Sequence, residues 1–350
     1  DGGYSLPLTT VRLDRSKVSS IRPPMTRPAQ HMTVADGILR IDTGLYRPGL
    51  AACYLIRSAD RLAFVDTGTS HTVPGLMQLV ADLGLTPDHV DYVIPTHVHL
   101  DHAGGAGALM AACPQARLVA HPKAAPHLID PTRLSSGATE VYGEAAFARD
   151  FGTLTPVAEE RVIVAEDGLV IDLAGRALTF IDTPGHANHH GCLHDAESQG
   201  WFTGDTFGIS YREFDTAAGP WIFAPTTPVA FDPEAWQHSL DRLLEPRPRA
   251  VYLTHYGRVD GPERLVDALR QSIRDLAAIA LAEEGRADDG RPARLQEAVK
   301  QHLVGSARAH GVRLPDSEIV ALLAVDIDLN AQGLEVWLRR RAKRAGASRA

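Results

Sequence analysis

The chain of 350 residues is long enough for one large domain or two ordinary ones, with a substantial buried core. Hydrophobic residues make up 44% and charged residues 22%, which is ordinary for a globular protein. The formal net charge of −8 argues against a general electrostatic attraction to nucleic acids or anionic membranes. We therefore expect neither a nucleic acid nor a membrane among its partners.

The cysteines and the hydropathy pattern indicate a compartment. Cys53, Cys113 and Cys192 are too few and too far apart for a disulfide framework or a thiolate metal site. No apolar run approaches the roughly 20 residues that span a membrane. The first 30 residues lack the charged segment and apolar core of a signal peptide. We therefore expect a protein of the reducing cytoplasm.

The N-terminal third predicts an arm followed by short strands. Residues 1–32 carry Pro7, Pro23, Pro24 and Pro28 among few periodic apolar positions, which predicts an extended arm. The run 72–83 has helical spacing and ends at Gly84. Around this helix, β-type runs predict strands at 38–41, 51–56, 62–65 and 90–94.

The middle of the chain continues the same alternation. A helix over 106–112 and a strand at 118–120 precede a stretch, 122–160, that we interpret as helix and loop over the functional site. Further strands are expected at 162–164, 169–173, 178–181, 201–203 and 251–254. Two strand-rich halves with intervening helices predict two sheets packed face to face and covered by helices, a layered α/β arrangement.

The pattern becomes helical after Gly261. Helices are predicted over 262–284, 292–310 and 315–343, the last one interrupted near Asn330. The predicted organisation is an extended arm at 1–32, a catalytic domain at 33–261 and an appended helical subdomain at 262–350. We expect this subdomain to pack over the site and to narrow access to it.

The segment Thr96-His97-Val98-His99-Leu100-Asp101-His102 directly follows the predicted strand 90–94. At an extended strand end His97 and His99 point to the same side and can share one metal ion. As the chain turns, Asp101 and His102 can face a neighbouring position. Imidazole nitrogen and carboxylate oxygen suit zinc, and also iron or manganese.

Three later residues can complete two metal sites, and each follows a β-type run. His186 lies in a Pro-Gly turn, Asp205 comes after the strand 201–203, and His255 follows Thr254 at the end of the last strand. A single histidine or aspartate after a strand is a weak signal. The four segments together are a specific one.

In this order, the HxHxDH segment, the TPGH turn, the TGD segment and the final TH resemble the metallo-β-lactamase superfamily, and the motif style is similar to that of glyoxalase II-like hydrolases. The resemblance covers about residues 33–260. It implies an αββα sandwich with the metals at one edge between the sheets. It also implies a ligand set divided between two metals: His97, His99 and His186 on the first, Asp101, His102 and His255 on the second, and Asp205 bridging both.

The resemblance implies roles for two further residues. Asp66, in a DTG strand end, would accept a hydrogen bond that orients a ligating imidazole. His190, four residues past His186, would contact the substrate or its oxyanion, with a structural role as the alternative. Separately from the resemblance, the position of Asp101 in the sequence suggests the hypothesis that it handles protons as well as binding metal.

The ligand set predicts a hydrolase. Two divalent cations would share a water, lower its pKa and present a bridging hydroxide to a small-molecule carbonyl substrate, and no GxSxG nucleophile motif is present. Thioesters and esters rank above lactones, because Phe207 and Gly208 occupy the place of the tyrosine typical of lactonases. The alternatives are a phosphodiesterase or nuclease on the same metals and an iron-dependent redox enzyme of the same fold. A homodimer is compatible with all of them.

An aromatic stretch after Asp205 is the predicted wall of the substrate pocket. It contains glycines and prolines, so we interpret it as a loop and not as a core helix. Its members are Phe207, Tyr211, Phe214, Trp221 and Phe223, with Arg212 among them.

Overall fold

The computed structural model describes residues 30–347, so most of the predicted arm lies outside the described residues. Strand β1 (His31–Ala35) begins at the end of the segment predicted as an arm. It pairs antiparallel with β2 (Ile38–Asp42), and Asp36 and Gly37 form the two-residue connection. Gly37 has a φ of +63°, as the Asp-Gly turns of tight hairpins require.

The first sheet has the strand order β1-β2-β3-β4-β5-β6-β7. Its antiparallel half continues with β3 (Ala52–Ser58) and β4 (Arg61–Val65). The strands β5 (Val90–Ile94), β6 (Arg117–Ala120) and β7 (Val162–Val164) then run parallel to β4. Helices α1 (Val73–Asp82) and α3 (Ala106–Ala112) lie in the connections between these parallel strands.

The second sheet has the order β13-β12-β11-β10-β9-β8. Its strands are β8 (Val170–Leu173), β9 (Arg176–Asp182), β10 (Gly191–Asp195), β11 (Gly200–Gly204), β12 (Ala250–Leu253) and β13 (Gly257–Asp260). All neighbours are antiparallel except β11 and β12, which α7 (Pro233–Leu244) connects.

Three of these elements, β10, β13 and α7, were not predicted. The two strands are short, and neither shows a run of alternating apolar residues that would distinguish it from a turn. Helix α7 does carry a local start signal, since the Asp232 side chain accepts a hydrogen bond from the Ala235 N–H and Pro233 follows it.

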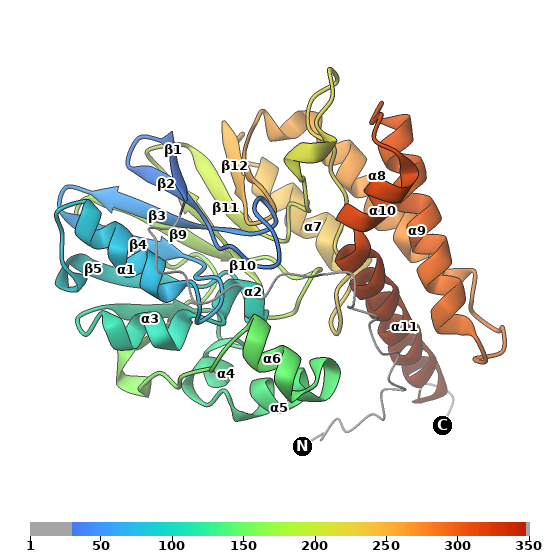
Figure 1. Ribbon diagram of the computed structural model, residues 1–350, viewed down its shortest axis with the longest axis horizontal. Coiled ribbons are helices and arrows are strands. Elements are labelled where there is room, and N and C mark those ends of the chain that lie inside the picture. Colours follow the sequence, from blue (N-terminus) through green and yellow to red (C-terminus); the bar gives the residue numbers. More distant parts are fainter. Residues whose placement is uncertain (1–29, 348–350) are drawn as a thin grey trace.

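Apolar side chains fill three layers between and outside the sheets. Tyr54, Phe180 and Phe202 belong to the cluster between the two sheets. A second cluster lies where α1 and α3 cover the first sheet. A third joins the outer face of the second sheet to α7 and to the C-terminal helices. Figure 1 shows this αββα layering, which confirms the predicted fold class.

The C-terminal region is helical, as predicted. It contains α8 (Val266–Leu281), α9 (Arg291–Ala309), α10 (Asp316–Leu322) and α11 (Ala324–Ala347), gathered at one end of the molecule in Figure 1. The predicted interruption near Asn330 is wrong, because the helix breaks at Leu323. Asn330 lies inside α11, where its side chain accepts a hydrogen bond from the Thr226 N–H at 2.6 Å.

The C-terminal helices share one continuous apolar cluster with the second sheet, so apolar contacts cross the proposed boundary at residue 261. The division into three segments stays a prediction. Between β6 and β7 lie three shorter helices, α4 (Ala125–Ile129), α5 (Thr132–Tyr142) and α6 (Glu144–Asp150). Among residues 30–347, no helix combines the length and the apolar character needed to cross a membrane.

Candidate metal centre

The histidine-rich segment leaves the end of β5 and turns into the short helix α2 (Leu100–Ala103). His97 and His99 lie in the extended part before the helix, with ring centroids 4.3 Å apart. Asp101 and His102 lie in the first turn of α2 and therefore face a different position. The backbone change from extended to helical thus divides one short segment between two groups of ligands.

The other three predicted ligands lie in connections that follow strands of the second sheet. His186 lies between β9 and β10, Asp205 follows β11, and His255 lies between β12 and β13. The structure brings all seven residues together in two groups. Within each group the possible ligand atoms lie within 4.8 Å of one another. The first group is His97, His99, His186 and Asp205, and the second is Asp101, His102 and His255.

Asp205 connects the two groups through its two carboxylate oxygens. Its Oδ2 lies 3.4 Å from His186 Nε2, in the first group. Its Oδ1 lies 3.3 Å from His102 Nε2 and 3.6 Å from His255 Nε2, in the second group. One carboxylate therefore faces both groups, as the resemblance implied for a bridging ligand.

Unpaired buried atoms show that these residues fit divalent cations. His97 Nε2, His102 Nε2 and Asp205 Oδ1 are buried and make no hydrogen bond among residues 30–347. Buried polar atoms are seldom left unpaired unless an ion, a water or a ligand satisfies them. Nitrogen and carboxylate oxygen donors converging in this number suit zinc, iron or manganese.

The opposite ring nitrogens are held by the protein, which fixes the orientation of the rings. His102 Nδ1 lies 2.8 Å from Asp66 Oδ2, and His97 Nδ1 lies 3.1 Å from the Thr96 hydroxyl. His186 Nδ1 donates to the Pro225 carbonyl at 2.8 Å, and His255 Nδ1 to the Leu50 carbonyl at 2.7 Å.

Asp66 has the contacts that were predicted for it, and more. Besides His102, its carboxylate accepts hydrogen bonds from the Thr96 N–H at 2.8 Å and from the Thr254 hydroxyl at 2.9 Å. Thr96 precedes His97, and Thr254 precedes His255. One buried carboxylate therefore positions both sheets' ligand segments relative to each other.

Burial and neighbouring charges set the protonation of the ligands. Burial lowers the pKa of His97, His99 and His186 below the usual imidazole range, so each offers a lone pair. Burial opposes the charged form of His102 as well, but three carboxylates, led by Asp101, raise its pKa well above that range. Such a concentration of negative charge around an imidazole favours a bound cation.

The structure does not support the predicted substrate contact of His190. The side chain is fully buried. Its Nδ1 lies 3.0 Å from the Thr183 hydroxyl and 3.1 Å from the Thr206 hydroxyl, while its Nε2 accepts a hydrogen bond from the Asp205 N–H at 3.2 Å. Both nitrogens are occupied, so His190 positions Asp205 and has no free atom for a substrate.

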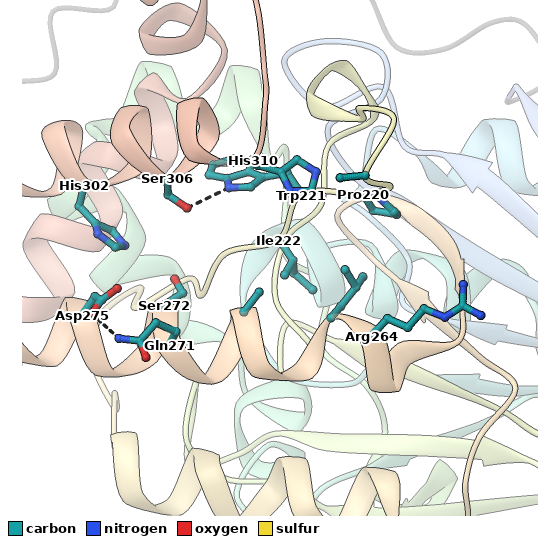
Figure 2. A pocket seen from close by; sticks show the side chains of 13 residues that line it. Pro220, Trp221, Ile222, Arg264, Gln271, Ser272, Asp275, His302, Ser306 and His310 are labelled. Carbon is teal, nitrogen blue, oxygen red and sulfur yellow. Dashed lines mark hydrogen bonds between the residues drawn. The ribbon is translucent and has the colours of Figure 1, made fainter.

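The aromatic stretch after Asp205 is mostly core and not pocket wall, which corrects that prediction. Phe207, Phe214 and Phe223 are at most 1% exposed and pack in the cluster shared with the C-terminal helices. Trp221 does line a cavity of about 420 Å³, but this cavity lies between α8 and α9 (Figure 2). None of the seven metal-centre residues lines it.

Tyr211 is the member of the stretch that reaches the centre. Its ring lies edge-on to His255, with centroids 6.4 Å apart, and its hydroxyl donates to both carboxylate oxygens of Asp326. Asp326 belongs to α11, so the C-terminal helices extend to the residues that pack on a predicted ligand. The sequence contained no local signal for this contact.

The sequence analysis did not identify the backbone carbonyls of Pro225 and Leu50 that accept hydrogen bonds from His186 and His255. Any residue type carries a backbone carbonyl, so the sequence contains no signal for such a contact. The repeated Thr-His pairs at 96–97 and 254–255 were visible, and their hydroxyl contacts to Asp66 could have been inferred.

The model of the Metallo-beta-lactamase superfamily matches residues 46–255, more than half of the chain. The chain belongs to this superfamily. The matched segment contains all seven residues of the two groups, and the superfamily consists mostly of metal-dependent hydrolases.

Two curated proteins are similar to this chain, each with 27% sequence identity. A metallo-beta-lactamase fold-containing protein of Sulfurisphaera tokodaii is 27% identical over 229 residues, which are 65% of this chain and 80% of that protein. The acyl-coenzyme A thioesterase MBLAC2 of Homo sapiens is 27% identical over 197 residues. That match covers 50% of this chain and 65% of the thioesterase.

Solved structures show the same fold. The crystal structure of the archaeal superfamily protein from Sulfolobus tokodaii aligns with a TM-score of 0.59 and 24% identity over 85% of this chain and 98% of that chain. A metallo-beta-lactamase family protein from Thermus thermophilus aligns with a TM-score of 0.55 and 20% identity over 89% and 95% of the two chains. At these identities the likeness establishes the fold alone.

Proposed function

We propose that this protein is a dinuclear metal-dependent hydrolase of small carbonyl substrates, thioesters or esters, with lactones ranked below them. The observation that carries the proposal is the position of Asp205, whose two carboxylate oxygens face the two groups of ligands separately. A single bridging carboxylate between two three-residue groups is the arrangement of a two-metal site. The proposed metals are two zinc ions, with iron or manganese as alternatives.

The residues of the proposed centre would have two roles, metal binding and proton transfer. His97, His99 and His186 would hold one cation, Asp101, His102 and His255 the other, and Asp205 both. When bound, two such cations would lower the pKa of a shared water and polarise the oxygen under attack. Asp101, with 28% of its side chain exposed, is the carboxylate open enough to take up and return a proton.

Two observations favour a carbonyl substrate over a phosphodiester. The formal net charge is −8, so no overall field attracts nucleic acid. A relative that matches half of the chain is named as an acyl-coenzyme A thioesterase. The small-molecule substrate and a possible homodimer stay part of the proposal, as does a cytoplasmic location.

The test is turnover on one panel of substrates by protein loaded with zinc and, separately, with iron. The panel contains an acyl thioester, an aryl ester, a lactone and a phosphodiester, and metal content is measured on each preparation. We expect a preference for thioester or ester that is lost in His99→Ala. His194→Ala is the matched control, because His194 packs against Trp201 and contacts no predicted ligand.

Dominant cleavage of the phosphodiester would overturn the carbonyl assignment in favour of a phosphodiesterase. Oxygen consumption by the iron-loaded protein, without hydrolysis, would instead support the redox alternative. Turnover that survives His99→Ala at full rate would remove the metal centre from the mechanism.

A further inference from the structure

A cavity lies apart from the metal centre, between α8 and α9 (Figure 2). Its volume of about 420 Å³ falls in the range of roughly 300–1,000 Å³ that is usual for sites of small organic ligands. Trp221 and Ile222, each 3% exposed, form its apolar inner wall. Ala268 and Gln271 of α8 also line it and are exposed, so a ligand can enter from solvent.

Hydrogen bonds hold the inner wall of this cavity in place. The Trp221 indole N–H donates to the Ser306 hydroxyl at 3.0 Å. His310 Nε2 lies 2.9 Å from the Gly219 carbonyl. Both bonds tie the wall segment to α9 or to the turn that follows it. The wall is thus ordered without a ligand, which lowers the entropy cost of binding one.

The charged side chains of the cavity lie at its two ends. Arg264 lies just before the start of α8, whereas Asp275 lies in the second half of that helix, and Figure 2 shows them far apart. Asp275 forms no ion pair among residues 30–347. Its Oδ1 accepts a hydrogen bond from the Gln271 amide at 2.7 Å, and its Oδ2 is left without one. The cavity therefore contains a carboxylate with no counter-charge.

His302 of α9 points toward Asp275 across the cavity in Figure 2. Its ring makes no hydrogen bond among residues 30–347. The buried unpaired atoms of those residues include neither ring nitrogen of His302 and neither oxygen of Asp275, so these atoms can be reached from solvent. Burial lowers the pKa of His302, although the Asp275 carboxylate opposes this shift. The neutral ring offers one nitrogen lone pair to the cavity.

These two side chains select a positively charged donor. A group between them meets a carboxylate oxygen and an imidazole lone pair, both of which accept hydrogen bonds. An ammonium group brings three donors and a charge, and its hydrogen bonds to a carboxylate are among the strong ones. A phosphate or carboxylate group would be repelled by Asp275. The buried side chains of Trp221 and Ile222 beside this position suit an apolar body.

We propose that this cavity is a binding site for an amphipathic organic amine, whose ammonium group lies between Asp275 and His302 and whose apolar body packs against Trp221 and Ile222. None of the seven predicted metal ligands lines the cavity. The site is therefore additional to the proposed hydrolase centre and does not depend on that function.

Three indole compounds of similar shape separate charge from apolar packing. Tryptamine has an ammonium group, tryptophol a neutral hydroxyl and indoleacetate a carboxylate. Their dissociation constants are measured by isothermal titration calorimetry on the zinc-loaded full chain at neutral pH. We expect one tryptamine per chain, bound about tenfold more tightly than either other compound, as one charge-assisted hydrogen bond predicts. Equal affinity for tryptamine and tryptophol, or tighter binding of indoleacetate, overturns the proposal.

Four variants place the amine in the cavity. Asp275→Asn keeps the shape and removes the charge, so tryptamine should bind about tenfold more weakly. Asp267→Asn is the matched control, since Asp267 is an exposed carboxylate of the same helix outside the cavity. Ala268→Leu fills part of the cavity and should abolish binding. Ala278→Leu, at an exposed position of α8 outside the cavity, should leave it unchanged.

His99→Ala shows whether the amine binds at the metal centre instead. We expect its affinity for tryptamine to equal that of wild type, because His99 is not part of the cavity. Loss of binding in His99→Ala with unchanged binding in Asp275→Asn places the amine at the metal centre and overturns the proposal. Absence of tryptamine binding to wild type overturns it as well. The midpoint of thermal unfolding, measured on every variant, shows that each one is folded.

Discussion

The imidazoles of four predicted ligands are oriented by different partners. His102 is held by a carboxylate, His97 by a hydroxyl, and His186 and His255 by backbone carbonyls. A carboxylate increases the basicity of the ring it holds more than a neutral group does. We therefore expect the second group of ligands to depend on Asp66 more than the first group does.

Asp66→Asn tests this dependence. The amide places a donor where His102 Nδ1 now has an acceptor, so the ring loses the tautomer that leaves Nε2 free for metal. We expect affinity for the second metal to fall by about 10- to 100-fold, while the first metal is retained. Titration against a chromophoric chelator measures both steps.

Asp42→Asn is the matched control, because Asp42 is also a buried carboxylate at a strand end. It accepts hydrogen bonds from the Gly44 and Gly49 N–H groups and from the Tyr256 hydroxyl, none of which is a ligand. Equal metal affinity in Asp66→Asn and wild type would show that Asp66 serves folding alone.

Among the secondary-structure elements, the end of β11 is a tightly constrained point beside the predicted ligands. Gly204, the last residue of β11, has a φ of +46° and precedes Asp205. A Cβ atom there would lie 2.5 Å from the Thr96 hydroxyl and 2.6 Å from His190 Nε2. Both the backbone conformation and the close approach of two ligand segments thus require glycine.

Gly204→Ala is expected to lower the free energy of unfolding by about 1–3 kcal/mol, because the added methyl group overpacks a buried site. It should also weaken metal binding, since relief of the contact displaces Asp205. Urea unfolding and metal titration measure the two effects.

Gly305→Ala serves as the opposite control. Gly305 lies on the exposed side of α9 with open space around its Cβ position, so alanine should raise the free energy of unfolding by about 1 kcal/mol through helix propensity. A neutral Gly204→Ala would mean that the β11 end adjusts freely, against the packing argument.

At the scale of the whole molecule, the guanidinium of a buried ion pair in the second sheet also reaches the first sheet. Arg176, at the start of β9, donates from Nε and Nη2 to the two oxygens of Asp195 at 2.8 and 2.6 Å. The same guanidinium also donates to the carbonyls of Arg57 in β3 and of Asp36 in the β1–β2 turn. Both charged side chains are at most 2% exposed. The Arg176 side chain therefore donates hydrogen bonds to residues of both sheets.

Stability in acid should depend on this pair. Burial acts to raise the pKa of Asp195, but the hydrogen bonds from Arg176 outweigh it and the pKa is lowered. A carboxyl group with a lowered folded-state pKa stabilises the fold above its unfolded pKa of about 3.9, and this contribution is lost as pH falls through the folded value. Wild-type stability should therefore decrease below about pH 4 in part through Asp195.

Asp195→Asn leaves the buried guanidinium without its counter-charge, so we expect a loss of about 3–5 kcal/mol at pH 7. The difference from wild type should stay constant between pH 7 and pH 5 and shrink as pH falls below about 4. Asp260→Asn, in the exposed pair with Arg258, should change stability by less than about 1 kcal/mol at either pH. A difference independent of pH would assign the loss at Asp195 to packing and not to charge.

The αββα fold and the convergence of the seven predicted ligands could be inferred from sequence because their signals are local. Each ligand follows a β-type run within a few residues, so strand ends alone place His97, Asp205 and His255 at sheet edges. The main helices, α1, α3, α8 and α9, follow their apolar spacing and glycine stops closely. Residue types and spacing suffice where the physical cause lies within one element.

The remaining features were decided by contacts between distant segments. Thr183 and Thr206 pair with Nδ1 of His190, whereas Nδ1 of the adjacent His189 makes no hydrogen bond among residues 30–347. Whether aromatic residues form core or pocket depends on the helices of residues 266–347 that cover them. Side chains at neighbouring positions have similar local signals, and only the tertiary partners that satisfy their polar atoms or cover their apolar surface distinguish them.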